Sequence, residues 1–275
     1  MSKNRELQLS VFVYNDRPES TQVHGLSAVM KKFGNNRMYL GDCLSVLKRI
    51  PDKMVSLIAC DLPYAQTSHS WDTMLPLEDL WMQYKRVLKP NGVVALTAKG
   101  QFMVDLILSN RDWYKYELVW DKRKASNFAH CKRRPLISHE FVLIFYEKQP
   151  TYNPQMVQGK PYVQKRKAGT VEGIAPNMTR SNVTKCEGLR YPKSILSVEG
   201  IPQRSIVHPT QKPVSLMEWL VLTYTNEKDY VLDNCMGSGT TGVACINTNR
   251  RFIGIEKDKT FFDCAVTRVE GAWYE

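Results

Sequence analysis

Apolar positions along the chain follow two periods in turn, which predicts strands alternating with helices. Before residue 150, apolar runs predict strands at 37–40, 55–60, 93–96, 116–120 and 141–146. Apolar stripes at a helical spacing predict helices between them, at 44–50, 77–88 and 102–108. After residue 205 the pattern resumes, with strands at 230–233 and 251–256 and helices at 213–224, 239–247 and 259–269.

This repeated alternation predicts an α/β fold in which a doubly wound sheet carries helices on both faces. The run at 55–60 is apolar throughout, which is typical of a parallel strand buried on both faces. Residues 149–203 lack a sustained period and are rich in Pro and Gly, so we expect an irregular insertion that orders fully on a ligand. The chain then divides into an N-terminal arm (1–36), two halves of one domain (37–121 and 206–275) and an inserted segment (122–205).

The composition narrows the class of protein. With 275 residues, 43% of them hydrophobic, the chain can bury one large core or two smaller ones, which excludes a disordered tail and a small disulfide-bonded scaffold. It has no run of about 18 apolar residues and its start lacks the apolar segment of a secretory signal, so we expect a soluble, cytoplasmic protein with no membrane partner. The seven cysteines form no C-x-x-C pair and the histidines have no ligand spacing, so we expect reduced thiols and no metal.

The net charge of +11 is concentrated in one third of the chain. Residues 122–212 contain 17 Lys and Arg against 5 Asp and Glu, a net of +12, which leaves −1 for the rest. Such segregation favours binding to a phosphate backbone over the alternative of a solvated surface loop. The candidate phosphate-binding residues form three clusters: Lys122, Arg123 and Lys124; Lys132, Arg133 and Arg134; and Lys165, Arg166 and Lys167.

A glycine-containing turn at 233–241 joins a predicted strand to a predicted helix. Its glycines let the backbone approach a bound nucleoside, and the helix N-terminus presents unpaired N–H groups to a carboxylate. Glu256 ends the next strand, 19 residues after Gly237, where it could accept hydrogen bonds from two ribose hydroxyls. Gly237, Gly239 and Gly242 also have the spacing of a dinucleotide fingerprint, so the pattern alone admits NAD, and a plain tight turn is the simplest alternative.

A second polar turn, Asp61-Leu62-Pro63-Tyr64, directly follows the buried strand. A carboxylate, backbone carbonyls and an aromatic ring at a rigid strand end could hold a planar amino group and stack on the ring that bears it. In isolation the same string indicates only a helix-capping aspartate in a proline turn. Because Asp233 also ends a strand, and the carboxyl ends of neighbouring parallel strands border one cleft, we expect Asp61 and Asp233 at a common site.

The chain resembles the β group of amino DNA methyltransferases, in which the catalytic motif precedes the recognition region and the cofactor motif follows it. The resemblance rests on four motifs of that family, D-P-P-Y at 61–64, D-x-F-x-G-S-G-T-T at 233–241, H-P-T-Q-K-P at 208–213 and G-D-C at 41–43. It covers residues 37–269. It implies a Rossmann-like methyltransferase sheet, mostly parallel with one antiparallel strand, and places the family's recognition region in the basic inserted segment.

By this resemblance the chain transfers methyl from S-adenosylmethionine to N6 of a flipped-out adenine in double-stranded DNA. The catalytic set is Asp61, Leu62, Pro63 and Tyr64, in which Asp61 and the Leu62 carbonyl hold the amino group and Tyr64 stacks on the base. The implied cofactor-binding residues are Asp42, Thr210, Gln211, Lys212, Asp233, Gly237, Ser238, Gly239, Thr240, Thr241 and Glu256. A restriction endonuclease as partner, and a monomer or a homodimer, both stay open.

Two positions depart from the family's motifs. Leu62 replaces the first proline of D-P-P-Y, which we expect to loosen the loop while the backbone carbonyl remains available as acceptor. Cys235 replaces the usual phenylalanine, which changes the packing expected around the adenine of the cofactor. His208 is interpreted either as part of the site or as a loop histidine with a capping role.

Three other functions fit parts of the pattern. Cytosine-N4 methylation uses the same geometry, but that branch usually begins its tetrad with serine, so Asp61 favours adenine. RNA or protein-amide methylation uses related tetrads, and the motif order and the basic segment argue against the amide substrate. A catalytically silent DNA-binding module would not need both Asp61 and Tyr64.

Overall fold

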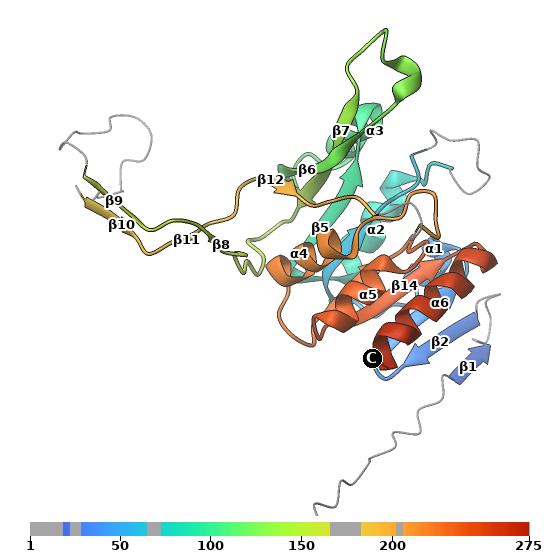
Figure 1. Ribbon diagram of the computed structural model, residues 1–275. Helices are drawn as coiled ribbons and strands as arrows, with labels where there is room; N and C mark the ends of the chain where they lie inside the picture. The colour runs from blue at the N-terminus through green and yellow to red at the C-terminus, as the bar shows by residue number, and fades with distance from the viewer. Residues whose placement is uncertain (1–18, 23–28, 65–72, 166–182, 202–205, 275) are drawn as a thin grey trace, which may run out of the picture.

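A mixed sheet of ten strands lies at the centre of the computed structural model, which describes residues 19–22, 29–64, 73–165, 183–201 and 206–274. The predicted α/β class is confirmed, with helices on both faces of the sheet (Figure 1). In spatial order the strands are β1 (Glu19–Gln22), β2 (Val29–Phe33), β3 (Asn36–Leu40), β14 (Arg251–Glu256), β13 (Tyr230–Asp233), β4 (Val55–Cys60), β5 (Leu88–Ala98), β7 (Ile137–Phe145), β6 (Tyr114–Ser126) and β12 (Ile195–Ser197).

The five strands from β3 to β5 run parallel. All six residues of β4 are buried, as its uninterrupted apolar sequence predicts. β13 and β14 come late in the chain, yet they lie between β3 and β4 from the N-terminal half. The sheet therefore places β13 directly beside β4, so that segments far apart in sequence end at the same edge.

The expected antiparallel strand is β7, which pairs antiparallel with both β5 and β6. A second one, β2, forms a hairpin with β3, and β1 pairs with β2, so the sheet extends into the segment 1–36 that the sequence suggested was an arm. The sequence of β2 hides this strand, because Lys31 and Lys32 interrupt its apolar positions; β2 lies next to the edge strand β1, and Lys32 stays exposed there.

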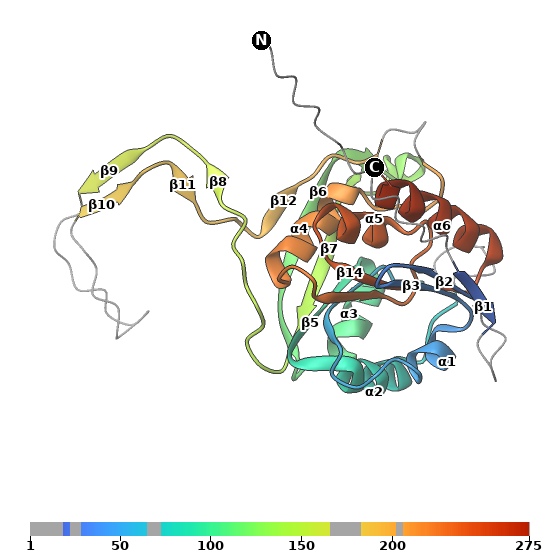
Figure 2. The ribbon, with the colours of Figure 1, turned by 90° about the horizontal axis from the view of Figure 1, so that it is seen from below.

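Helices form a layer on each face of the sheet (Figure 2). One face carries α1 (Cys43–Leu47), α2 (Leu77–Val87) and α3 (Gly100–Ser109), and the other carries α4 (Val214–Tyr224), α5 (Thr240–Asn247) and α6 (Lys259–Tyr274). Successive residues of β4 serve the two cores in turn: Ile58 packs with the first layer, and Leu57 and Ala59 pack with the second. No helix within the described ranges has the length and apolar character needed to cross a membrane.

The inserted segment is part sheet and part extension. Its predicted start at residue 122 falls inside β6, because the charges of Lys122, Arg123 and Lys124 conceal the strand pattern there. The segment also contains β7, which lies inside the sheet between β5 and β6. The short 3₁₀ helix η1 (Phe128–His130) lies between β6 and β7. Further on, β8 (Val157–Gln158), β9 (Tyr162–Lys165), β10 (Val183–Cys186) and β11 (Leu189–Arg190) form a thin, exposed ribbon that projects from the sheet (Figures 1 and 2).

Candidate active site

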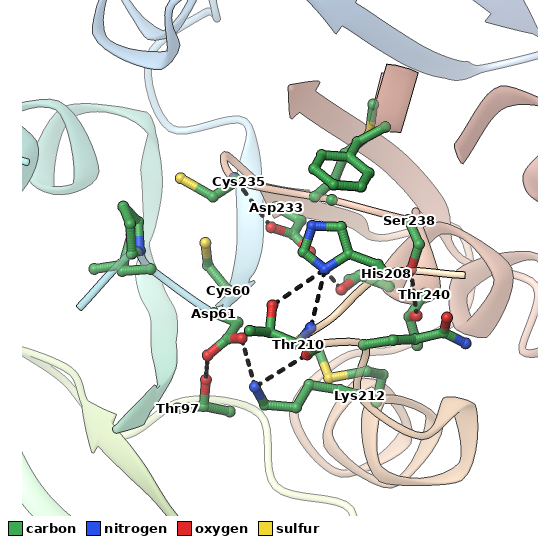
Figure 3. Close-up of a pocket in the computed structure, with 18 of the residues that line it drawn as sticks. Cys60, Asp61, Thr97, His208, Thr210, Lys212, Asp233, Cys235, Ser238 and Thr240 are labelled. Carbon is green, nitrogen blue, oxygen red and sulfur yellow. Dashed lines mark hydrogen bonds and ion pairs between the residues drawn. The ribbon is translucent and has the colours of Figure 1, made fainter. Parts of the chain in front are cut away.

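The carboxyl ends of β4 and β13 border a cavity of about 480 Å³. The two strands are parallel neighbours, and the helices that follow them, α2 and α5, pack on opposite faces of the sheet, which opens a crevice between the strand ends. Asp61 follows β4 and Asp233 ends β13, and both line the cavity (Figure 3). The structure thus brings the two polar turns to one site.

Three side chains bond to the carboxylate of Asp61, and Figure 3 shows two of them, Thr97 and Lys212. The hydroxyl of Tyr64 donates to Oδ1 at 2.7 Å, and the hydroxyl of Thr97, near the end of β5, donates to the same oxygen. The ammonium group of Lys212 donates to Oδ2. Burial and the neighbouring Asp61 raise the pKa of Tyr64, so its hydroxyl stays protonated and available as a donor.

The ring of Tyr64 is already in contact with protein. It packs on Phe102 with ring centroids 4.7 Å apart and an interplanar angle of 31°, and Nζ of Lys99 lies 5.8 Å from its centroid. Stacking on a base therefore has to use the ring face that Phe102 leaves open. Leu62 is buried in the core beneath α2 and anchors the turn, while Pro63 lines the cavity beside it.

Asp233 is buried, and its carboxylate shapes the glycine turn. Oδ2 accepts a 2.6 Å hydrogen bond from the hydroxyl of Thr241, and Oδ1 accepts one of 3.2 Å from the N–H of Cys235. Burial raises the pKa of Asp233 to about 6 in spite of these bonds. The carboxyl group therefore titrates close to neutral pH.

The backbone of the turn depends on its glycines. Gly237 and Gly239 have φ values of 49° and 74°, in the left-handed region that favours glycine, and a Cβ on Gly239 would lie 2.9 Å from that of Ala265 in α6. Glu256, at the end of β14, accepts the N–H of Gly237 at Oε2 (2.9 Å) and that of Asp258 at Oε1 (2.8 Å). Each of its oxygens keeps a lone pair for a ligand in the cavity.

The C-terminal helix supports the same turn through Arg268, a residue that sequence reasoning missed. Its Nη1 donates to the carbonyl (2.6 Å) and the hydroxyl (2.8 Å) of Ser238 and to the hydroxyl of Thr240 (3.2 Å). Ser238 and Thr240 both line the cavity. Arg268 has no motif of its own, so only the packing of α6 against α5 reveals its role.

Asp42 caps α1, because its side chain accepts the N–H of Ser45 at 2.9 Å. Asp42 and the next residue, Cys43, also line the cavity. Cys60 and Cys235 line it as well, and all three thiols are free. Cys235, which replaces the usual phenylalanine of the motif, therefore lines the cavity together with two other small thiol side chains.

Residues 208–212 close the cavity on the side of α4. Nδ1 of the buried His208 accepts the N–H of Thr210 at 3.2 Å, and its ring meets Phe261 with centroids 4.1 Å apart. The side chain of Gln211 turns back to accept the N–H of Val207 at 2.9 Å. His208 therefore bonds within its own loop, as a capping histidine would, and also borders the cavity, so the two interpretations of this residue are compatible.

The ammonium group of Lys212 lies at Asp61, although the resemblance placed this lysine among the cofactor-binding residues. It also lies 3.7 Å from Glu140 of β7, a second residue that sequence reasoning missed. Glu140 follows Ser138 and His139 and directly precedes the apolar run 141–145 of the same strand, so no pattern in the sequence marks it as a buried residue. Thr97 could have been found from the rule that located Asp61, since β5 is the parallel neighbour of β4.

The predicted phosphate-binding residues lie in three places. Lys122 is not a surface cation as expected: it shares a face of β6 with the buried Trp120, and its Nζ lies 2.9 Å from Oε1 of Glu140 inside the cavity. The exposed cations Arg123, Lys124, Lys132, Arg133 and Arg134 gather around the end of the β6–β7 hairpin, and Lys165 lies on the ribbon. Arg166 and Lys167 lie outside the described residues.

The chain that forms this cavity is similar in sequence to known proteins. Residues 55–267 match a family model described as DNA methylase, of the N6 and N4 type. The chain is 28% identical over 264 residues to the Type II methyltransferase M.BglII of Bacillus subtilis, which covers 86% of this chain and 69% of that one. It is 25% identical over 262 residues to the Type II methyltransferase M.HinfI of Haemophilus influenzae, covering 85% and 68%.

Solved structures show the same fold. The crystal structure of the M1.HpyAVI–SAM complex superposes with a TM-score of 0.56 at 25% identity, covering 84% of this chain and 98% of that one. The cytosine-N4-specific PvuII DNA methyltransferase superposes with a TM-score of 0.59 at 16% identity, covering 88% and 93%. At 16% identity, the similarity to the PvuII enzyme shows a shared fold alone. The family match includes both turns that border the cavity.

Proposed function

Because the chain belongs to the DNA methylase family of N6 and N4 amino methyltransferases, we propose that it transfers methyl from S-adenosylmethionine to N6 of adenine in double-stranded DNA. The observation that carries this proposal is the shared cavity of Asp61 and the glycine turn. A carboxylate that can hold an amino group faces a turn suited to a nucleoside, so donor and acceptor can meet between them. Methyl transfer needs that juxtaposition.

The residues of the cavity fit S-adenosylmethionine. Its volume of about 480 Å³ suits a ligand of this size. Glu256 has lone pairs for two ribose hydroxyls, and Asp42 offers a carboxylate nearby. Asp233, the turn at 237–241 and the cavity-lining residues Thr210 and Gln211 complete the proposed cofactor site. When bound, S-adenosylmethionine supplies an electrophilic methyl group on a sulfonium sulfur. The M1.HpyAVI–SAM complex supports this assignment.

Asp61 and the backbone carbonyl of Leu62 act on the amino group of the base. Its lone pair is delocalised into the purine ring, which makes the nitrogen a poor nucleophile. Hydrogen bonds from the two N–H groups to these acceptors hold the lone pair out of conjugation and directed at the methyl group. The N–H protons become acidic only as the new N–C bond forms, so Asp61 needs to be a good acceptor but not a strong base.

The base has to leave the duplex to reach this cavity, at a cost of a few kcal/mol. The open face of the Tyr64 ring offsets part of that cost by stacking. The exposed cations at the end of the β6–β7 hairpin and Lys165 on the ribbon hold the phosphates. Sequence recognition is assigned to the ribbon and the remainder of the inserted segment.

Cytosine N4 is the second candidate acceptor, because the PvuII enzyme shares the fold. We favour adenine because the tetrad begins with Asp61, whereas the cytosine-N4 branch usually begins it with serine. The Type II names of M.BglII and M.HinfI support a restriction–modification setting, in which an endonuclease is the genetic partner of this chain.

The test is to incubate the full chain with duplex DNA and labelled S-adenosylmethionine, hydrolyse the DNA and identify the labelled base by mass. We expect N6-methyladenine, and none from an Asp61→Ala variant that still binds the cofactor. N4-methylcytosine would replace the proposed acceptor. Label found only in RNA or protein would overturn the proposal. Mapping of modified adenines in a host genome then gives the recognised sequence.

A further inference from the structure

The carboxylate of Asp61 is crowded before any base arrives. The hydroxyls of Tyr64 and Thr97 both bond to Oδ1, which uses both lone pairs of that oxygen. Lys212 bonds to Oδ2, so one lone pair of the carboxylate is left for a base. A target amino group would therefore share Oδ2 with a lysine ammonium group.

That sharing opposes the reaction. An ammonium group on Oδ2 withdraws negative charge from the acceptor and so weakens its hold on the amino group. The same positive charge repels the positive charge that develops on the amino nitrogen as the N–C bond forms. Methyl transfer is therefore favoured when Lys212 leaves Asp61, and the displaced ammonium group needs another anion inside the cavity.

Glu140 is that anion. Its side chain is only 11% exposed, and Oε1 pairs with Lys122 at 2.9 Å. The other oxygen, Oε2, is fully buried, makes no hydrogen bond in the described part of the chain and lies 3.7 Å from Nζ of Lys212. A buried carboxylate oxygen without a hydrogen-bond donor is costly, which indicates that a donor reaches it in another state of the site.

We propose that Glu140 is a positioning residue that receives the ammonium group of Lys212 when the target amino group binds Asp61. The move is short, because Nζ already lies between the two carboxylates. Burial acts to lower the pKa of Lys212, but Asp61 and Glu140 outweigh it and the pKa lies above its usual value, so the lysine stays charged on either partner. The inference rests on the proposed function, because it assumes that a base amino group binds Asp61.

A simpler role for Glu140 is to hold Lys122 alone. The two roles differ in the residue to which Glu140 is energetically coupled. If Glu140 acts through Lys212, its charge matters only while Lys212 is present. If it acts through Lys122, or only supports the fold, removal of Lys212 leaves the effect of Glu140 unchanged.

A double-mutant cycle separates these roles, with single-turnover methylation of duplex DNA as the readout. We expect Glu140→Gln to lower the rate constant roughly 10- to 100-fold, the size of effect that misplacement of a group in an active site produces, with the affinity for S-adenosylmethionine unchanged. In the Lys212→Met background the same substitution is expected to cost less than about twofold, because the two effects share one cause. An equal loss in both backgrounds, or coupling to Lys122→Met instead, would overturn the inference.

A crystal structure of the wild-type chain with S-adenosylhomocysteine and a duplex carrying its target site tests the inference without relying on a variant that folds. We expect Nζ of Lys212 within hydrogen-bond distance of Glu140 and the adenine amino group on Asp61. Lys212 still bound to Asp61 beside a bound base would overturn it. Failure of the proposed function would show separately, as wild-type protein that forms no N6-methyladenine, and would remove the inference as well.

Discussion

The hydroxyl of Tyr64 donates a hydrogen bond of 2.7 Å to Oδ1 of Asp61. Tyr64 therefore has two separable parts in the proposed site, a hydroxyl that bonds to the carboxylate and a ring that we propose stacks on the base on the side away from Phe102. The contact with Phe102 holds the ring in place for both.

Tyr64→Phe removes only the hydroxyl. A hydrogen bond to a charged group is worth about 1.5–3 kcal/mol, so we expect the single-turnover rate constant to fall roughly 10- to 150-fold while the KM for DNA changes little. Tyr64→Ala removes the ring as well and should also raise the KM for DNA. Equal KM values for the two variants would show that the ring does not stack on the base.

Replacing Asp233 should change how stability depends on pH. Its pKa is about 6 in the folded chain against an ordinary value of 3.8, so it contributes stability that is fully present at low pH and is lost as the pH rises from about 4 to about 6. The Asp233→Asn variant has no carboxyl group to ionise at this position, so its stability does not fall in this way as the pH rises. We expect the free energy of unfolding of the variant, relative to wild type, to increase by about 2 kcal/mol between pH 4 and pH 7.

Urea unfolding at a series of pH values measures this difference. A gap between the two proteins that stays constant with pH would contradict the raised pKa. Thr241→Val tests the same group in the opposite direction: it removes a hydrogen bond that lowers the pKa of Asp233, so the loss of stability with rising pH should extend to a higher pH than in wild type.

The thiols of the cavity should resist alkylation. The hydrogen bond with Cys235 raises the pKa of Cys43, and burial raises that of Cys60 to about 12, so neither forms the reactive thiolate at pH 8. Cys131 is exposed and should react first with iodoacetamide. Peptide mass mapping over time gives the order, and urea-unfolded protein is the control in which all seven cysteines react. Early modification of Cys60 in the folded protein would contradict the prediction.

The cations at the end of the β6–β7 hairpin should set the salt dependence of DNA binding. The triple variant Lys132→Gln, Arg133→Gln, Arg134→Gln is expected to reduce the slope of log K against log salt by about 2–3, since each phosphate contact contributes about 0.9. The measurement is a fluorescence titration of duplex DNA at several salt concentrations.

A matched control removes three charges from the opposite edge of the sheet. Lys53, Lys85 and Lys148 line a separate surface pocket, and Lys53 precedes the amino end of β4, whereas the proposed site lies at its carboxyl end. Their replacement by glutamine should leave the slope nearly unchanged. A similar reduction in both variants would mean that overall charge, and not the hairpin end, governs binding.

The sequence predicted the parallel part of the sheet well, because each of its strands has an apolar run that is at least partly buried, although β5 begins at Leu88, before the predicted 93–96. The predicted bounds of β4, β13 and β14 match those of the structure. β2 and the outer part of β6 could not be predicted in this way. Lys32 of β2 is tolerated because its side chain stays exposed, and Lys122 of β6 because it pairs with the buried Glu140, and neither feature is visible in local periodicity.

The candidate site was predictable where chemistry follows a strand end, as at Asp61, Asp233 and Glu256. The contacts of Lys212 with Asp61 and Glu140 could not be predicted, because they depend on the path of the loop that precedes α4 and borders the cavity. Arg268 shows the same limit, since its contact with Ser238 arises from the packing of two helices. Side chains that act through tertiary contact leave little trace in spacing.

The placement of β13 and β14 between β3 and β4 also bears on how the protein is made. During translation, residues 36–60 leave the ribosome long before residues 230–256, so β3 and β4 remain with unpaired edges through most of synthesis. The nascent chain thus carries two open strand edges until its last strands arrive to fill the gap. The need for chaperones should increase with the time between synthesis of residues 36–60 and synthesis of residues 230–256. Synonymous codons that slow the ribosome before residue 230 should therefore lower the yield of folded protein.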